Sequence, residues 1–356
     1  MKRFVKKAVS LLLVSGMALS MAACGGSSSS SSASGSASGA SSEKKVTLNM
    51  SHTQAPNSVS DLTAQEFAKL VSEKSNGSVE VKVYTNCGLS GGDLTKAIEM
   101  VQTGDIDIHS CAPANIANFD KRFYVFWLPY LFNTEEDLIN KCGSEEFKTA
   151  INGWCNSLNM TMLGINNAGA RQISNSKKEI TTPEDLQGLN IRVPGANVFI
   201  DLYKDYFHAN PTAMDFSEVY TALQQGTIDG EENPVPIVES NKLDEVQKYN
   251  SLTGHLFSPA PVFISKDYYD GMPEEYQKAV MEAGKESVDY QREQIDEQTA
   301  SGIEVMKERT GMETNEVDKS LFKDATAPLY DQYIKDESGC VNPDIYKRVM
   351  EVVEAN

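Results

Sequence analysis

The chain has 356 residues, 40% of them hydrophobic, and a formal net charge of −18 at pH 7. This length is enough for about two domains with apolar cores. The acidic balance argues against nucleic acid as a partner, and beyond the N-terminal segment no run of 18 apolar residues is present to span a membrane.

The N-terminus has the pattern of a secretory signal peptide, which we place at residues 1–23. Its first seven residues include four basic side chains, and an apolar stretch runs from Ala8 to Met21. The sequence Met-Ala-Ala-Cys then resembles the bacterial lipobox, in which Cys24 becomes the lipidated first residue of the mature protein. The alternative is an ordinary signal peptide followed by a chance cysteine. Because residues 1–23 contain no acid, the mature chain has a net charge of −22.

Residues 24–44 form a linker rich in serine and glycine. The stretch 25–42 reads GGSSSSSSASGSASGASS, which cannot bury apolar surface and should behave as a flexible coil with a reach of roughly 23 Å. We therefore predict a tether that holds a folded body away from a membrane.

Five cysteines follow Cys24 in the chain. An odd number cannot all pair within one chain, and the spacings match no zinc pattern. Disulfides are permitted outside the cell, but the sequence does not set the pairing. We predict that most of these residues are free and buried: Cys87, Cys111, Cys142, Cys155 and Cys340.

The first folded segment alternates strands and helices. Residues 46–51 and 79–84 have the alternation of half-buried strands, and 60–77 has one apolar helical face that ends at Asn-Gly. A glycine-rich loop, a helix from Asp93 and a strand near 105–110 follow. This order is the signature of an α/β lobe.

An internal repeat indicates a second lobe of similar design. DLTKAIEMVQTGDID at 93–107 aligns with DFSEVYTALQQGTID at 215–229, and five pairs are identical: Asp93/Asp215, Gln102/Gln224, Gly104/Gly226, Ile106/Ile228 and Asp107/Asp229. Each copy predicts an acidic helix start, a glycine stop and a strand. Since ligands bind beyond the carboxyl ends of strands in open α/β sheets, residues 109–112 and 231–233 should face a shared cleft.

The remaining chain completes two lobes and a long helix. The aromatic run 123–132 should pack in the core or between the lobes, and 190–194 should form a strand. Helical sequence runs from Pro273 to about Arg309, roughly 55 Å if unbroken, without a coiled-coil heptad. We therefore divide the folded body as follows: lobe I, 45–167 plus about 258–300; lobe II, 168–257 plus about 301–356.

Motifs for catalysis or cofactor binding are missing from the sequence. The four histidines have no paired spacing, and no HExxH, GxSxG, Walker or GxGxxG pattern occurs. The 50 acidic residues are scattered, so no catalytic pair stands out. We predict a binding protein with no metal and no cofactor, although an extracytoplasmic enzyme stays open as an alternative.

Several long motifs resemble the solute-binding proteins of tripartite ATP-independent periplasmic (TRAP) transporters, the DctP family. The resemblance covers about 46–340 and is carried by ARQISNSKKEITTPEDLQGLNIRVPGANVF, DFSEVYTALQQGTIDGEENP, NCGLSGGDL, FWLPYLF and VQKYNSLTGH. It implies an α/β, two-lobed, periplasmic-binding-protein-like fold, with a ligand cleft between the lobes and a long crossing helix. It also implies a ligand that carries at least one carboxylate.

The resemblance assigns ligand contacts to five positions: Arg192, Arg171, Asn233, Phe216 and His52. Arg192, in the family's Arg-Val-Pro strand, is the implied clamp for the ligand carboxylate, and a planar guanidinium suits this bidentate task. The alternatives are a solvated arginine at 192, a surface ion pair at 171, a plain turn at 233, core packing at 216 and a structural hydrogen bond at 52. The chain departs from the family in having Glu231 where glutamine is usual, and its loop 109–113 shows no obvious acid or amide for a polar ligand group.

These features predict an extracytoplasmic, lipid-anchored, monomeric protein that captures an organic acid and delivers it to a TRAP membrane permease. The resemblance implies delivery driven by an ion gradient. The alternatives are a receptor subunit that reports a solute to a signalling protein, and a surface hydrolase or lyase acting on sugar acids. The sequence does not choose among C4-dicarboxylates, sugar acids and keto acids, because Arg171 permits a second carboxylate without requiring one.

Overall fold

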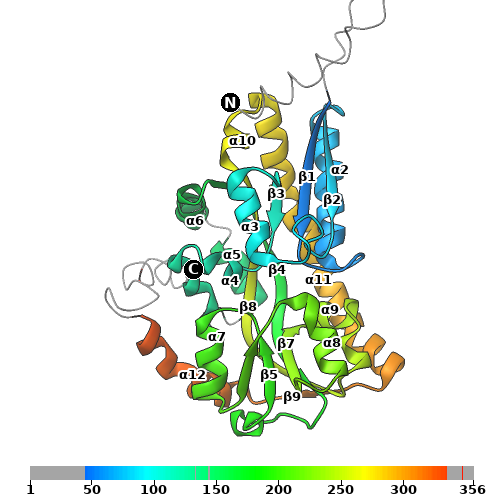
Figure 1. Cartoon of the computed structure of the whole chain (residues 1–356), viewed down its shortest axis with the longest axis vertical. Coiled ribbons are helices and arrows are strands. Elements are labelled where there is room, and N and C mark those ends of the chain that lie inside the picture. Colours follow the sequence, from blue (N-terminus) through cyan, green and yellow to red (C-terminus); the bar gives the residue numbers. More distant parts are fainter. Residues whose placement is uncertain (1–44, 133, 143–144, 335–346, 348–356) are drawn as a thin grey trace, which may run out of the picture.

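One nine-stranded sheet runs through the body of the protein, in the order β2-β1-β3-β8-β4-β7-β5-β6, with β9 paired to β8 (Figure 1). The structure is a computed structural model, and it describes residues 45–132, 134–142, 145–334 and 347. The predicted signal peptide, the linker, Cys24 and Cys340 lie outside the described residues.

The first lobe is built on three parallel strands with helices packed against them. Strand β1 pairs with both β2 and β3, and α2 packs its apolar stripe on this sheet. Positive φ angles at Asn76 and Gly77 follow the end of α2, as the sequence predicts. The elements are β1 (Val46–His52), α2 (Val59–Lys74), β2 (Val79–Tyr84), α3 (Leu94–Thr103), β3 (Ile108–Ser110), α4 (Pro113–Ala117), η1 (Lys121–Trp127), α5 (Glu135–Cys142) and α6 (Glu145–Ser157).

The second lobe repeats the parallel arrangement, with β5 between β6 and β7. Its elements are η2 (Pro183–Leu186), β5 (Asn190–Val193), α7 (Asn197–Asp201), η3 (Leu202–Tyr206), β6 (Asn210–Ala213), η4 (Phe216–Glu218), α8 (Val219–Gln224), β7 (Gly230–Pro234), α9 (Val235–Ser240), η5 (Leu243–Glu245), β9 (Glu313–Glu316) and α12 (Lys319–Tyr333). The two-lobed α/β fold is confirmed.

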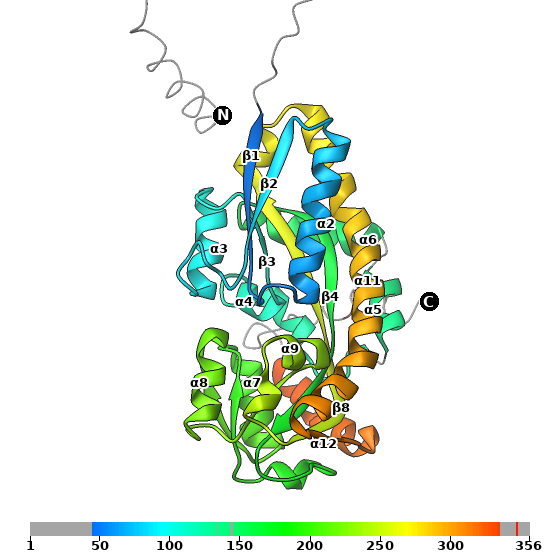
Figure 2. The same cartoon turned by 90° about the vertical axis from the view of Figure 1, so that its right-hand side faces the viewer.

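Three long elements join the lobes, and α10 (Lys266–Asp270) leads into the last of them. They are β4 (Met160–Asn175), β8 (Tyr249–Ser265) and α11 (Glu274–Thr310). The predicted crossing helix is confirmed as one helix of 37 residues, which runs beside α2 in the first lobe and reaches α9 in the second (Figure 2). Each proposed lobe boundary, at 167, 257 and 300, falls inside one of these crossing elements.

The two glycines within α11 let the helix approach each lobe closely. A Cβ atom on Gly284 would lie 2.5 Å from the carbonyl oxygen of Leu163 in β4, and one on Gly302 would lie 3.0 Å from Val235 in α9. The first distance is far below a normal contact, so Gly284 allows the helix backbone to touch the sheet.

The internal repeat is confirmed as a repeated structural unit. Gly104 and Gly226 have φ angles of 76° and 70° at the ends of the two helices. Asp107 then accepts hydrogen bonds from the backbone and side-chain nitrogens of Asn49 in β1, at 2.8 and 3.2 Å. Asp229 accepts the same pair from Asn190 in β5, at 2.8 and 3.0 Å. In each lobe the repeated aspartate therefore fixes its own strand to the neighbouring parallel strand.

Predictions about packing also hold in the described residues. Cys87, Cys111 and Cys155 are free and buried, and Cys142 is also buried. The aromatic run is buried in the largest apolar core, where Trp127 packs edge-on against Phe199 of the second lobe at 4.4 Å. Among the described helices, we find none with the length and apolar character needed to cross a membrane.

Candidate ligand-binding site

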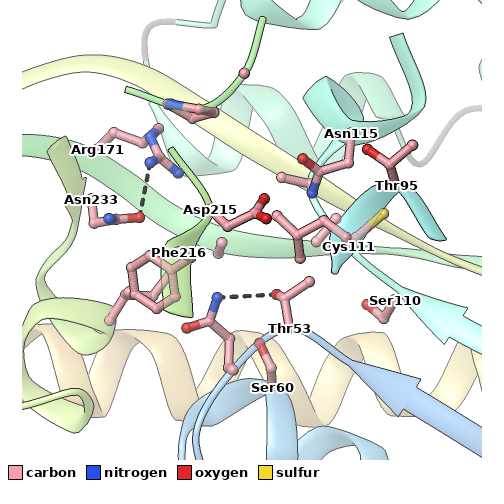
Figure 3. Close-up of a pocket in the computed structure, with 18 of the residues that line it drawn as sticks. Thr53, Ser60, Thr95, Ser110, Cys111, Asn115, Arg171, Asp215, Phe216 and Asn233 are labelled. Atoms are coloured by element: carbon pink, nitrogen blue, oxygen red, sulfur yellow. Dashed lines mark hydrogen bonds between the residues drawn. The ribbon is translucent and has the colours of Figure 1, made fainter. Parts of the chain in front are cut away.

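A cavity of about 160 Å³ lies between the lobes (Figure 3). The parallel strands of each lobe direct their carboxyl ends toward it, and the residues that follow those strands form its walls. The first lobe contributes mainly small polar side chains: Thr53, Gln54, Ser60, Thr95, Ser110, Cys111 and Asn115. The second lobe contributes Arg192, Met214, Asp215, Phe216 and Asn233, and β4 adds Arg171.

Arg192 brings a buried positive charge to this cavity. Its neighbours Ile191 and Val193 have no exposed surface, and Arg192 itself is only 3% exposed. Its Nε and Nη2 atoms donate to the carbonyl oxygen of Met214 at 3.1 and 2.8 Å, and its Cζ lies 5.6 Å from the centre of the Phe216 ring. Burial lowers the pKa of Arg192 to about 10, so the side chain stays charged at neutral pH.

The absence of an anionic partner distinguishes Arg192. Among the described residues, no carboxylate forms an ion pair with its guanidinium. A buried cation that is held only by a neutral carbonyl is unfavourable unless an anion joins it. The geometry therefore suits a carboxylate bound in the cavity.

Arg171 also lines the cavity, but its charge is already matched. Its Nε donates to Oε2 of Glu232, and its Nη2 donates to Oε1 of Glu232 and Oδ1 of Asn233, each at 2.8 Å. Burial alone would raise the pKa of Glu232, but the charge of Arg171 and a contact with His255 hold it below its usual value. The carboxylate of Glu232 is therefore ionised and neutralises Arg171.

The side chain of Asn233 joins Arg171 to Glu231. Its Oδ1 accepts from Arg171, and its Nδ2 donates to Glu231. Glu231 also accepts from Ser174 at 2.6 Å, and burial raises its pKa. Glu231 thus adds an acidic group behind the cavity wall, where its carboxyl group holds the amide of Asn233 in place.

The structure places His52 outside the cavity wall, which corrects its position in our sequence interpretation. Its ring is 1% exposed, and its Nε2 lies 3.3 Å from Oδ1 of Asp61. Burial lowers the pKa of His52. The next two residues, Thr53 and Gln54, bring this segment to the cavity instead.

Several lining residues were not predicted from the sequence. Asp215 was recognised only as a helix start, and Thr53, Thr95 and Asn115 were not singled out. Asn115 supplies the first-lobe amide that loop 109–113 itself lacks. A usable signal was present, because Thr95 and Asp215 lie at the starts of the repeated helices, where a βα connection faces the cleft.

Two lobes that enclose a cavity, with a buried cation that no described carboxylate pairs, define a protein that binds an anionic solute between its lobes. Among the described residues, no group of three or more histidine, cysteine, aspartate or glutamate side chains is arranged to hold a metal ion. The family model described as DctP, bacterial extracellular solute-binding protein, family 7, matches residues 50–336. The chain belongs to this family, which confirms the resemblance found in the sequence.

Individual relatives in this family are named for, or were solved with, different organic acids. The chain is 32% identical over 280 residues to the 2,3-diketo-L-gulonate-binding periplasmic protein YiaO of Escherichia coli, an alignment covering 77% of this chain and 83% of the relative. It is 28% identical over 291 residues to the C4-dicarboxylate-binding periplasmic protein DctP of Rhodobacter capsulatus, covering 81% and 86%. A TRAP periplasmic solute-binding protein from Sulfitobacter sp. NAS-14.1, solved with bound β-D-galacturonate, has a TM-score of 0.80 at 30% identity, covering 87% of this chain and 100% of that one.

Proposed function

We propose that this protein captures an organic acid between its lobes outside the cytoplasm and delivers it to the membrane permease of a TRAP transporter. The single observation that carries the proposal is Arg192, a buried guanidinium that faces the cavity and has no anionic partner in the described part of the chain. A ligand carboxylate would complete the charge pair and receive two parallel hydrogen bonds, the geometry in which arginine binds carboxylates best.

The other lining residues have supporting roles in this proposal. Phe216 holds one face of the Arg192 guanidinium and forms part of the wall beside the ligand. Arg171 and Asn233 form a rigid, hydrogen-bonded wall behind it. Names and bound ligands among the relatives, namely 2,3-diketo-L-gulonate, a C4-dicarboxylate and β-D-galacturonate, support an organic acid as the solute.

The location and assembly of the protein belong to the same proposal. The lipobox at Cys24 and the linker 24–44 support a lipid anchor, by which the protein would be held as a monomer at the outer face of the cell membrane. The protein releases its ligand chemically unchanged, because transport needs a carrier and the permease performs the membrane step. The lobe boundaries within β4, β8 and α11 would then be the positions at which the lobes move as they open and close.

A screen of organic acids by thermal unfolding tests the proposal. A ligand present at 100 times its Kd adds about 2.7 kcal/mol to the free energy of unfolding, so binders are readily identified. We expect at least one sugar acid, C4-dicarboxylate or keto acid to raise the unfolding temperature, and chromatography should recover it unaltered after long incubation. Failure of all three classes, or conversion of the acid to a product, would contradict the proposal.

A further inference from the structure

The cavity walls contain only three charged side chains among the described residues: Arg171, Arg192 and Asp215. Arg171 is bound through two nitrogens to the carboxylate of Glu232. It therefore has no net charge to offer a second ligand carboxylate. Only Arg192 remains for an anion, and Asp215 adds a negative charge to the same cavity.

Comparison of the two repeats shows that the carboxylate of Asp215 is not used as a helix cap. Asp93 caps α3 by accepting a hydrogen bond from the backbone nitrogen of Lys96 at 2.9 Å. Asp215 occupies the equivalent position before η4, but its side chain makes no capping bond. It accepts no hydrogen bond from any described residue, and it points into the cavity (Figure 3). The repeat places both aspartates at a helix start, but only Asp215 directs its carboxylate to the ligand space.

The opposite wall is neutral and rich in hydrogen-bonding groups. Hydroxyl groups of Thr53, Ser60, Thr95 and Ser110 and the amide of Asn115 line the cavity from the first lobe. These side chains both donate and accept, which suits ligand hydroxyl groups. A carboxylate, which only accepts, would find no second cation there.

We infer that the site selects polyhydroxy monocarboxylates, and that Asp215 determines this specificity by accepting ligand hydroxyl groups and repelling a second carboxylate. The inference rests on the proposed function, because it assumes that Arg192 binds the first carboxylate. Arg171 is already matched by Glu232 behind the wall, so a dicarboxylate would bring a second anion into a cavity where Arg192 is the remaining cation and Asp215 is already negative.

Matched acids test the inference on the purified protein. D-Gluconate and D-glucarate have the same carbon skeleton and differ in whether carbon 6 is an alcohol or a carboxylate; D-galactonate and galactarate form a second pair. D-Glucuronate, D-galacturonate, L-malate and hexanoate complete the panel, and calorimetry gives Kd for each. We expect the tightest ligand to be a hydroxylated monocarboxylate, with its dicarboxylate counterpart at least tenfold weaker.

Two variants test the role of Asp215. Asp215→Asn removes the charge and keeps the size, so it should reduce the preference for monocarboxylate over dicarboxylate at least fivefold. Glu218→Gln removes the same charge from an exposed residue three positions after Asp215 and outside the cavity wall, so it should leave the preference within twofold of the wild type. Both changes are at solvent-accessible side chains, and thermal unfolding without ligand checks that each variant is folded.

Each outcome separates this inference from the proposed function. If malate or an aldarate binds as tightly as the best monocarboxylate, the inference is wrong and the proposed function stands. Tighter binding of hexanoate than of gluconate would remove the role of ligand hydroxyl groups. An unchanged preference in Asp215→Asn would remove Asp215 as the determinant. If no organic acid binds at all, the proposed function fails and the inference fails with it.

Discussion

Replacing either cavity arginine with alanine should impair the protein, but the two replacements should affect different properties. Arg171 is paired inside the protein with Glu232, and their side chains are 5% and 0% exposed. Arg192 donates only to the carbonyl of Met214 and has no carboxylate partner among the described residues. We therefore expect Arg171→Ala to reduce stability and Arg192→Ala to reduce affinity.

The expected changes in unfolding free energy and in Kd depend on which charges and hydrogen bonds each substitution leaves unpaired. Arg171→Ala leaves Glu232 as a buried, uncompensated charge, which typically costs about 3–5 kcal/mol of unfolding free energy. Arg192→Ala removes two hydrogen bonds but also removes a desolvated cation, so the ligand-free protein should change by less than about 1.5 kcal/mol. With ligand, the carboxylate loses its partner at a cost of about 2–5 kcal/mol, roughly 30-fold to several-thousand-fold in Kd.

Denaturant unfolding without ligand and calorimetric titration with the acid found in the screen measure the two effects. Arg192→Lys keeps the charge and loses the planar fork, so its Kd should lie between those of the wild type and Arg192→Ala. Arg122→Ala, at a partly exposed pair with Asp120 outside the cavity wall, is the matched control and should bind normally. An Arg192→Ala variant that binds within threefold of the wild type, or an Arg171→Ala variant of unchanged stability, would refute the reasoning.

Four further predictions concern anchoring, closure, packing and pH. Cys24→Ser should release the protein from membranes in cell fractionation with ligand affinity unchanged; retention in the membrane fraction would contradict the lipid anchor. The cognate acid should reduce the radius of gyration in solution scattering, whereas a constant radius would indicate a preformed site. Gly284→Ala should lower the unfolding free energy by about 1–3 kcal/mol, because its Cβ would meet Leu163; an unchanged denaturation midpoint would show that the helix can shift away. Burial raises the pKa of Glu231, so wild-type stability should fall as pH rises from the ordinary glutamate pKa through the raised one. The unfolding temperature of Glu231→Gln relative to that of the wild type should therefore increase as pH rises above the ordinary glutamate pKa, and a constant difference would argue against a raised pKa.

Most of the fold could be predicted from the sequence because its signals are local. The helix at 273–309 needed only a long stretch without proline, and α11 occupies Glu274–Thr310. The repeat at 93–107 and 215–229 predicted two similar lobes because each copy contains its own helix start, stop and following strand. The crossing strands β4 and β8 were not predicted, since a strand shared by two lobes has no distinct sequence signal at the crossing point.

For the candidate site, the sequence and the tertiary structure supply different information. The sequence alone determined that Arg192, Arg171, Phe216 and Asn233 belong to one block of the chain, and the structure brings all four to the cavity. Only the tertiary structure decided which of their charges are available. Glu232 reaches Arg171 across 61 positions because β4 and β7 pair in the sheet, and this contact leaves Arg192 as the unmatched cation.

Contacts set by the tertiary structure also explain where the side chains of His52 and Asp215 point. His52 follows the expected strand but turns toward Asp61 in α2, so its imidazole never reaches the cavity. Asp215 has the same sequence context as Asp93, yet its carboxylate does not cap its helix and points into the ligand space. Local sequence determines where a strand or helix begins and ends. The availability of a charged side chain depends on partners from distant segments, and those partners are set only when the two lobes assemble.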